Sequence, residues 1–225
     1  MASRLRLGVL VSGRGSNLEA ILGAIAAGRL AAETRVVVSD RADAPALTRA
    51  RAAGVPVVIL DPGSRPARLD ARADQQLLEA LRAHQVELVV LAGFMRILST
   101  AVLEAVASPM INIHPSLLPA FPGLDAPRQA LDYGAQVTGC TVHFVDPGAV
   151  DGGAIIAQRA VPVHAGDTRD QLADRILQEE HRLLVDVLGW FAARRVVRTG
   201  RRVHIRDQAG GSGSGMQAAG AAAGE

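Results

Sequence analysis

A carboxamide and an imidazole stand two positions apart in the sequence Asn112-Ile113-His114-Pro115. The apolar run around them predicts a strand, and in a strand Asn112 and His114 point to the same side while Ile113 turns into the core. The carboxyl ends of strands are where open α/β sheets bind ligands. The pair therefore offers a neutral hydrogen-bond donor and a proton carrier to one small region. Taken alone, the pattern also fits a strand end with a local side-chain bond.

Asp151 precedes two glycines in a loop that leads into a strand. Glycine lets the backbone pass close to a ligand, so this carboxylate could lie beside a bound molecule. It could pair with His114 and accept a proton, either directly or through water. An Asp-Gly-Gly sequence alone is usually only a turn, so the hypothesis of a catalytic trio depends on the longer sequences around these residues.

The sequence Gly13-Arg14-Gly15-Ser16-Asn17 lies between an apolar run and a helical pattern. Unpaired N–H groups at a helix start favour an anion, which predicts a phosphate site; a tight turn that needs glycine for its backbone alone is the alternative. A dinucleotide-binding loop has a third glycine where this chain has Leu18, although Asp40 lies near the acidic position of that motif. We therefore predict a monophosphate site, with side-chain donors from Ser16 and Asn17.

Composition excludes several kinds of chemistry. All 24 basic residues are arginines, so lysine chemistry is impossible, and a phosphate must be held by backbone N–H groups, hydroxyls and arginine. Cys140 is the only cysteine, which excludes an internal disulfide and predicts a small buried side chain. The six histidines have no zinc-binding spacing, so we expect no metal.

Apolar runs alternate with helical patterns along most of the chain. Strands are predicted over residues 5–11, 35–39, 55–60, 88–92 and 110–113, and a hairpin or edge pair over 137–145 and 154–163. Helices are predicted from a cap at Ser16-Asn17 to about Gly28, over 45–53 and 71–84, from a cap at Ser99 to 107, and over 128–133 and 169–195. This order indicates the α/β class, with a mainly parallel, twisted, Rossmann-like sheet covered by helices on both faces, C-terminal edge strands and a long helix.

We expect one domain over residues 1–208 and a disordered tail rich in Gly, Ala and Ser over 209–225. No apolar run approaches the roughly 18 residues that a membrane span needs, which predicts a cytoplasmic protein with no membrane contact. Six arginines between positions 194 and 206 could contact RNA, but a solvated terminal strand is the favoured interpretation, so no nucleic-acid partner is expected. The sequence leaves a monomer and a homodimer open.

Longer sequences around the candidate residues resemble those of the phosphoribosylglycinamide formyltransferase family, the folate-dependent transformylases of purine synthesis. The matching sequences are SGRGSNLEAIL at 12–22, LAGFMRILS at 91–99, NIHPSLLPAFPGL at 112–124, RQAL at 128–131, HFVDPGAVDGG at 143–153 and QEEH at 178–181. They occur in the family's order across about residues 5–206.

This resemblance implies a formyltransferase fold and a role for each matching residue. Its catalytic residues would be Asn112, His114 and Asp151; its residues for the substrate phosphate and sugar would be Gly15, Ser16, Asn17 and Glu180; and its folate-binding residues would be Met95, Arg96, Ile97, Leu98, Asp146 and Val150. Two segments depart from the family pattern. The segment 65–72 lacks an aromatic residue that members often have, and the loop 146–150 is about one residue longer than in some members.

The implied activity moves a formyl group from the co-substrate 10-formyltetrahydrofolate to the amine of glycinamide ribonucleotide, without a metal. Formylation of methionyl-tRNA is the nearest alternative, because that family shares the HPSLLP core, but it normally carries an additional C-terminal domain. A formyltetrahydrofolate hydrolase is another, and its members carry an N-terminal regulatory domain. A nucleotide-binding module or an NAD-dependent oxidoreductase would leave the trio unexplained.

Overall fold

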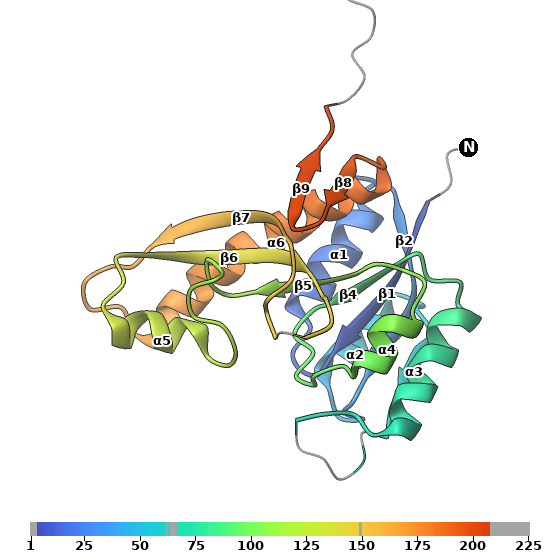
Figure 1. The fold of residues 1–225 in the computed structure, drawn as a ribbon. Helices are drawn as coiled ribbons and strands as arrows, with labels where there is room; N and C mark the ends of the chain where they lie inside the picture. The colour runs from blue at the N-terminus through green and yellow to red at the C-terminus, as the bar shows by residue number, and fades with distance from the viewer. Residues whose placement is uncertain (1–3, 62, 64–66, 149, 208–225) are drawn as a thin grey trace, which may run out of the picture.

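A seven-stranded sheet forms the centre of the computed structural model, which describes residues 4–61, 63, 67–148 and 150–207 (Figure 1). Its strands are β1 (Leu5–Val11), β2 (Ala32–Ser39), β3 (Val57–Ile59), β4 (Leu88–Leu91), β5 (Met110–His114), β6 (Val137–Phe144) and β7 (Ile155–Pro162). The helices are α1 (Ser16–Ala26), α2 (Pro45–Ala52), α3 (Ala71–Ala83), α4 (Thr100–Ala105), α5 (Ala126–Tyr133) and α6 (Arg169–Ala192). All the predicted elements are present, with ends that differ by a few residues. The predicted tail, 209–225, lies outside the described residues.

The strands lie in the order β3-β2-β1-β4-β5-β6-β7. The pairs from β3 to β5 are parallel, whereas β6 pairs antiparallel with both β5 and β7. The predicted mainly parallel sheet with a hairpin at one edge is therefore confirmed. Because β1 lies between β2 and β4, the chain leaves the sheet centre first in one direction and then in the other, as in doubly wound folds.

Alternating side chains of the strands fill two separate cores. Val9 of β1 belongs to the core beneath α1, α2 and α6, and Leu10 belongs to the core beneath α3 and α4. Both side chains are fully buried, because a parallel strand packed between helices has no solvent face. The expected cover of helices on both faces is thus confirmed, and Figure 1 shows the two layers on either side of the strands. The predicted burial of Cys140 is also confirmed.

The start of α1 differs from the prediction. Gly15, not Ser16 or Asn17, is the N-cap residue, and no side chain caps this end of the helix. Gly15 has a φ of 76°, and a Cβ atom placed on it would lie 2.5 Å from the Cβ atom of Ala46 in α2. The close approach of α2 therefore requires glycine at the cap and turns Ser16 into the first helical residue.

The arginine-rich segment after α6 forms a two-stranded hairpin rather than the single solvated strand that we expected. Its strands are β8 (Val196–Thr199) and β9 (Arg202–Ile205), paired antiparallel. The hairpin stands at the end of α6, and β9 contacts β7 (Figure 1). Within the described residues, no helix is long and apolar enough to cross a membrane.

Gly139→Ala is expected to destabilise the fold by about 1–3 kcal/mol, which is typical of overpacking. A Cβ atom at Gly139 in β6 would lie 1.9 Å from the carbonyl oxygen of Arg159 in β7, so the two paired strands would have to separate. Urea unfolding would measure the loss. Gly23→Ala is the matched control, because Gly23 lies in α1 with nothing within 4 Å of the added atom. Equal stability of the two variants would contradict this account of strand packing.

Candidate active site

The carboxyl ends of β1, β4 and β5 open into a cavity of about 910 Å³. The start of α1, the loop after β4, the loop between β6 and β7, and part of α6 complete its walls. The cavity lies at the point where the strand order reverses, which is where doubly wound sheets bind ligands. Every residue that the sequence assigned to catalysis, substrate or folate lines this one cavity.

Strand β5 presents Asn112 and His114 to the cavity, while the side chain of Ile113 belongs to the core, as predicted. His114 is buried, and its Nε2 atom donates a hydrogen bond to the carbonyl oxygen of Phe121 at 2.9 Å. That bond fixes the imidazole ring and leaves Nδ1 facing the Asp151 carboxylate at 3.4 Å. Nε2 therefore carries the hydrogen in the neutral ring, and Nδ1 faces the carboxylate.

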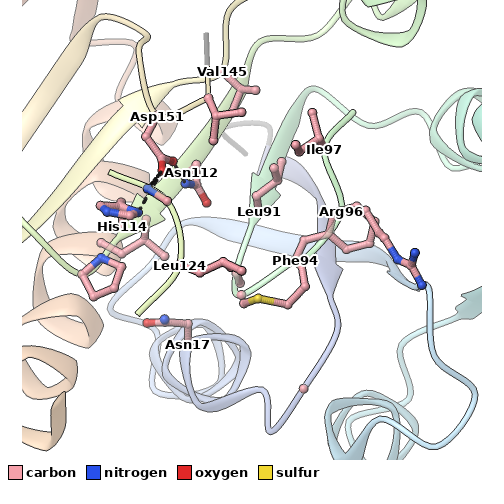
Figure 2. A pocket seen from close by; sticks show the side chains of 18 of the residues that line it. Asn17, Leu91, Phe94, Arg96, Ile97, Asn112, His114, Leu124, Val145 and Asp151 are labelled. Carbon is pink, nitrogen blue, oxygen red and sulfur yellow. Dashed lines mark hydrogen bonds and ion pairs between the residues drawn. The ribbon is translucent and has the colours of Figure 1, made fainter. Parts of the chain in front are cut away.

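Asp151 lies in the loop between β6 and β7 and points inward to meet the two β5 side chains (Figure 2). Its Oδ2 atom accepts the backbone N–H of Gly123 at 2.8 Å, and its Oδ1 atom accepts from the Asn112 amide at 3.4 Å. Burial acts to raise the pKa of Asp151, but the contacts with His143, Gly123 and His114 outweigh it and hold this pKa below its usual value. The group is thus a carboxylate at neutral pH.

His143 is a buried member of this cluster that the sequence did not single out. It pairs with Asn112 across the antiparallel β5–β6 ladder, and its Nε2 atom lies 3.2 Å from the Asn112 amide nitrogen and 3.7 Å from Oδ1 of Asp151. Its Nδ1 atom donates to the carbonyl oxygen of Phe144 at 2.8 Å, so Nε2 is the ring atom that faces Asn112 and Asp151. Only the strand pairing reveals this role, because 31 positions separate the two residues along the chain.

The glycine-rich turn before α1 forms the opposite wall of the cavity, where Gly15, Ser16 and Asn17 lie. Because no side chain caps this helix end, the first-turn N–H groups remain available to an anion. The Asn17 amide donates to Oε2 of Glu180 in α6 at 2.9 Å, and Oδ1 of Asn17 is buried without a hydrogen-bond partner among the described residues. The turn therefore places a helix start that can bind an anion next to the buried carboxyl group of Glu180.

Glu180 is 6% exposed, and burial raises its pKa to about 7, with the Asn17 hydrogen bond partly opposing that rise. A carboxyl group that is half protonated near neutrality can either donate or accept a hydrogen bond. Hydroxyl groups of a sugar can serve as the partner in both cases. Glu180 therefore lies beside the helix start for which the sequence predicts a phosphate site, and its binding of sugar hydroxyls stays a prediction.

The segment after β4 carries Met95, Arg96, Ile97 and Leu98 along the cavity. Arg96 points away from the trio (Figure 2), and its Nε atom donates to Oδ2 of Asp40 at 2.7 Å. Ser12 donates to the other Asp40 oxygen at 2.5 Å and accepts the N–H of Met95 at 2.8 Å. Asp40 therefore anchors this segment through both of its carboxylate oxygens.

Three exposed apolar side chains lie around the cavity: Met95 at 60%, Leu124 at 79% and Val150 at 56% exposure. Apolar walls with a few placed polar groups are typical of sites for flat organic ligands. Asp146, the other predicted folate residue of the β6–β7 loop, lines the cavity but turns its carboxylate toward Arg198 of β8. Among the described residues, no group of ligands could hold a metal ion.

A doubly wound sheet with a largely buried Asn-His-Asp cluster and an open helix start at its strand ends is typical of an α/β enzyme that acts on small molecules. Residues 5–188 match the family model described as formyl transferase. The chain belongs to the formyl transferase family.

Similar proteins agree with this assignment. The chain is 44% identical over 184 residues to the phosphoribosylglycinamide formyltransferase of Escherichia coli K12, covering 82% of this chain and 85% of that protein. It is 41% identical over 183 residues to the protein of the same name from Bacillus subtilis 168, covering 81% and 92%. The crystal structure of glycinamide ribonucleotide transformylase 1 from Symbiobacterium toebii superposes with a TM-score of 0.86 at 52% identity, covering 92% and 96%.

The free energy of unfolding of Glu180→Gln, relative to that of the wild type, is expected to increase as the pH rises. The folded-state pKa of about 7 lies above the unfolded value, so the native state binds the proton more tightly, and wild-type stability falls as the pH rises toward 7. Between pH 5 and pH 8 the difference in unfolding free energy should grow by about 2–3 kcal/mol.

Urea unfolding of both proteins at the two pH values measures that difference. Glu104→Gln, an exposed change on α4, serves as the control and should show no such growth. A stability difference for Glu180→Gln that stays constant from pH 5 to pH 8 would rule out a buried, titrating carboxyl group.

Proposed function

We propose that this protein transfers the formyl group of 10-formyltetrahydrofolate to the amine of glycinamide ribonucleotide, giving formylglycinamide ribonucleotide and tetrahydrofolate. The observation that carries the proposal is the single cavity in which the Asn112–His114–Asp151 trio faces an uncapped helix start. The trio suits formyl transfer, and the helix start suits the acceptor's phosphate. The names of the similar proteins specify the same acceptor.

The acceptor would lie between α1 and α6. Its phosphate would accept hydrogen bonds from the N–H groups at Gly15 to Asn17 and from the Ser16 hydroxyl, since the chain has no lysine to bind it. Glu180, held by Asn17 at 2.9 Å, would bind the sugar hydroxyls. With its phosphate and sugar held in this way, the acceptor would point its amine toward the carboxyl end of β5.

The folate donor would occupy the more apolar half of the cavity. Its pterin ring would contact the segment Met95 to Leu98 and the β6–β7 loop at Asp146 and Val150. Leu91, Ile97 and Val145 supply apolar surface between these segments and the trio (Figure 2). The formyl group would then lie where donor and acceptor meet, beside Asn112.

In the reaction, the uncharged amine attacks the formyl carbon and negative charge develops on the formyl oxygen. The Asn112 amide would stabilise that oxyanion as a hydrogen-bond donor, and the positive charge of protonated His114 would stabilise it electrostatically. The bond from the carbon to the folate nitrogen then breaks, the amine loses a proton, and the folate nitrogen gains one. Asp151, 3.4 Å from Nδ1 of His114, would stabilise the imidazolium and help to move that proton.

The acceptor can be tested by offering the protein 10-formyltetrahydrofolate with glycinamide ribonucleotide, methionyl-tRNA or water alone. We expect formylated glycinamide ribonucleotide, identified by mass spectrometry, at a rate at least about a hundredfold above either alternative, since only this acceptor satisfies both the phosphate site and Glu180. Formyl-methionyl-tRNA or free formate as the main product would replace the proposed acceptor with transfer RNA or with water.

Asn112→Ala and Asp151→Asn are each expected to lower kcat by about a hundredfold or more, with little change in the KM for either substrate. Each change removes a group that would act on charge present mainly in the transition state. Steady-state kinetics with both substrates measures the effect. Asp132→Asn is the control, because Asp132 is exposed on α5 and its ion pair with Arg128 is 3.9 Å long. Full activity in Asp151→Asn would exclude the proton role of this carboxylate.

A further inference from the structure

The arginines of the β8–β9 hairpin belong neither to the catalytic trio nor to the proposed substrate sites, yet two of them contact a loop that lines the cavity. The hairpin follows residue 188, where the match to the formyl transferase family model ends. Two of its arginines, Arg198 and Arg201, reach back to the loop between β6 and β7, which carries Asp151. Residue 149 of that loop lies outside the described part of the chain, and the contacts below involve the residues on either side of it.

Arg198 binds the first residues of the loop. Its two terminal nitrogens donate to the two oxygens of Asp146 at 2.8 and 2.7 Å, which is the planar, bidentate geometry in which arginine pairs are strong. The guanidinium also lies 4.8 Å from the centre of the Phe144 ring at the end of β6. The hydrogen bonds from Arg198 are the main reason why the pKa of Asp146 lies below its usual value, and they outweigh the opposing effect of burial.

Arg201 binds the other end of the loop. Its guanidinium donates to the carbonyl oxygen of Gly152 at 2.9 Å, and Gly152 is joined directly to Asp151. Arg198 and Arg201 therefore bind the loop on both sides of Asp151. Asp146 also accepts the backbone N–H of Ala154 at 3.4 Å, so the loop's two ends are tied to each other as well as to the hairpin.

The loop needs such support because its backbone is strained at Asp151. Asp151 has a φ of 54°, a left-handed conformation that costs free energy for a residue other than glycine. At Gly153, an added Cβ atom would lie 1.7 Å from the carbonyl oxygen of Phe144, so the chain closes tightly there. On the inside, the loop is held by the hydrogen bond from Gly123 to Asp151, and on the outside by Arg198 and Arg201.

Two arginines of the hairpin are thus engaged within this chain. The charge of Arg198 is already paired with a carboxylate of this chain, and Arg201 is engaged by a carbonyl oxygen. Arg202, the first residue of β9, is exposed, and its side chain has no hydrogen bond or ion pair with any described residue.

We propose that Arg198 and Arg201 are positioning residues for formyl transfer: they hold the β6–β7 loop from outside and so place the Asp151 carboxylate and the folate wall of the cavity. This inference rests on the proposed function, because it assigns a geometric role within that reaction. Arg198 and Arg201 have no hydrogen bond or ion pair, among the described residues, with the start of α1 or with Glu180, which form the acceptor side of the site.

The test compares Arg198→Ala, Arg198→Lys, Arg201→Ala and the matched control Arg202→Ala by steady-state kinetics with both substrates. Arg198→Ala and Arg201→Ala should lower kcat/KM for 10-formyltetrahydrofolate by about tenfold or more, since displaced catalytic groups lose rate steeply. The KM for glycinamide ribonucleotide should change less than about twofold, because its site is untouched. Arg198→Lys should lower kcat/KM for 10-formyltetrahydrofolate less than Arg198→Ala does, since lysine keeps the charge but loses the bidentate fork.

A double variant separates positioning from general stability. If Arg198 acts through Asp146, then Asp146→Asn with Arg198→Ala should lose no more activity than the worse of the two single variants. Additive losses would mean that Arg198 acts by another route and would overturn the proposal. So would kinetics of Arg198→Ala and Arg201→Ala that match those of Arg202→Ala.

Amide hydrogen exchange of the peptide that spans the β6–β7 loop gives a readout independent of activity. Exchange should quicken in Arg198→Ala and in Arg201→Ala, but not in Arg202→Ala, while thermal midpoints stay within a few degrees of the wild type. Unchanged exchange in both variants overturns the positioning role. A wild type that forms no formylglycinamide ribonucleotide, with exchange that quickens as described, overturns the proposed function alone and leaves the grip of the hairpin on the loop established.

Discussion

A carboxylate removed from water must find hydrogen-bond donors inside the protein, and the need to satisfy Asp151 organises this site. Its donors come from separate parts of the chain: the N–H of Gly123 from the proline-rich segment after β5 and the amide of Asn112 from β5 itself. His114 completes the cluster at 3.4 Å. Asn112 and His114 both belong to β5, and Gly123 belongs to the segment after it, so the contacts of one carboxylate join these two segments to the β6–β7 loop and assemble the trio.

The sheet makes that assembly possible by bringing strand ends together. β1 and β5 are both neighbours of β4, so the turn that follows β1 and the residues that end β5 face one cavity. Helix α6 packs across the same region and contributes Glu180 from far along the chain. The proposed phosphate site, sugar site and reactive centre thus face one cavity, as a reaction between two bound molecules requires.

Arginine takes several structural roles in this lysine-free chain. Arg96 and Asp40, together with Ser12, secure the segment that would contact the pterin. Arg198 and Asp146 secure the loop on the other side of the cavity. In each pair a guanidinium anchors a loop that lines the site, while the anion site at α1 relies on backbone N–H groups. Cationic side chains therefore shape the cavity walls in addition to any contact with ligands.

The sequence by itself determined the α/β class and the order of the elements up to α6, because apolar periodicity depends only on neighbours along the chain. Local motifs indicated Asn112, His114, Asp151 and the turn before α1, whereas Glu180 and the folate residues followed only from the resemblance to a known family. The sequence did not determine the cap of α1, since the need for glycine at position 15 comes from Ala46 in another helix. His143 and the roles of Arg198 and Arg201 emerged only from antiparallel pairing and from a hairpin that folds back. Such contacts join residues tens of positions apart, and only the packing of the whole chain decides which of them form.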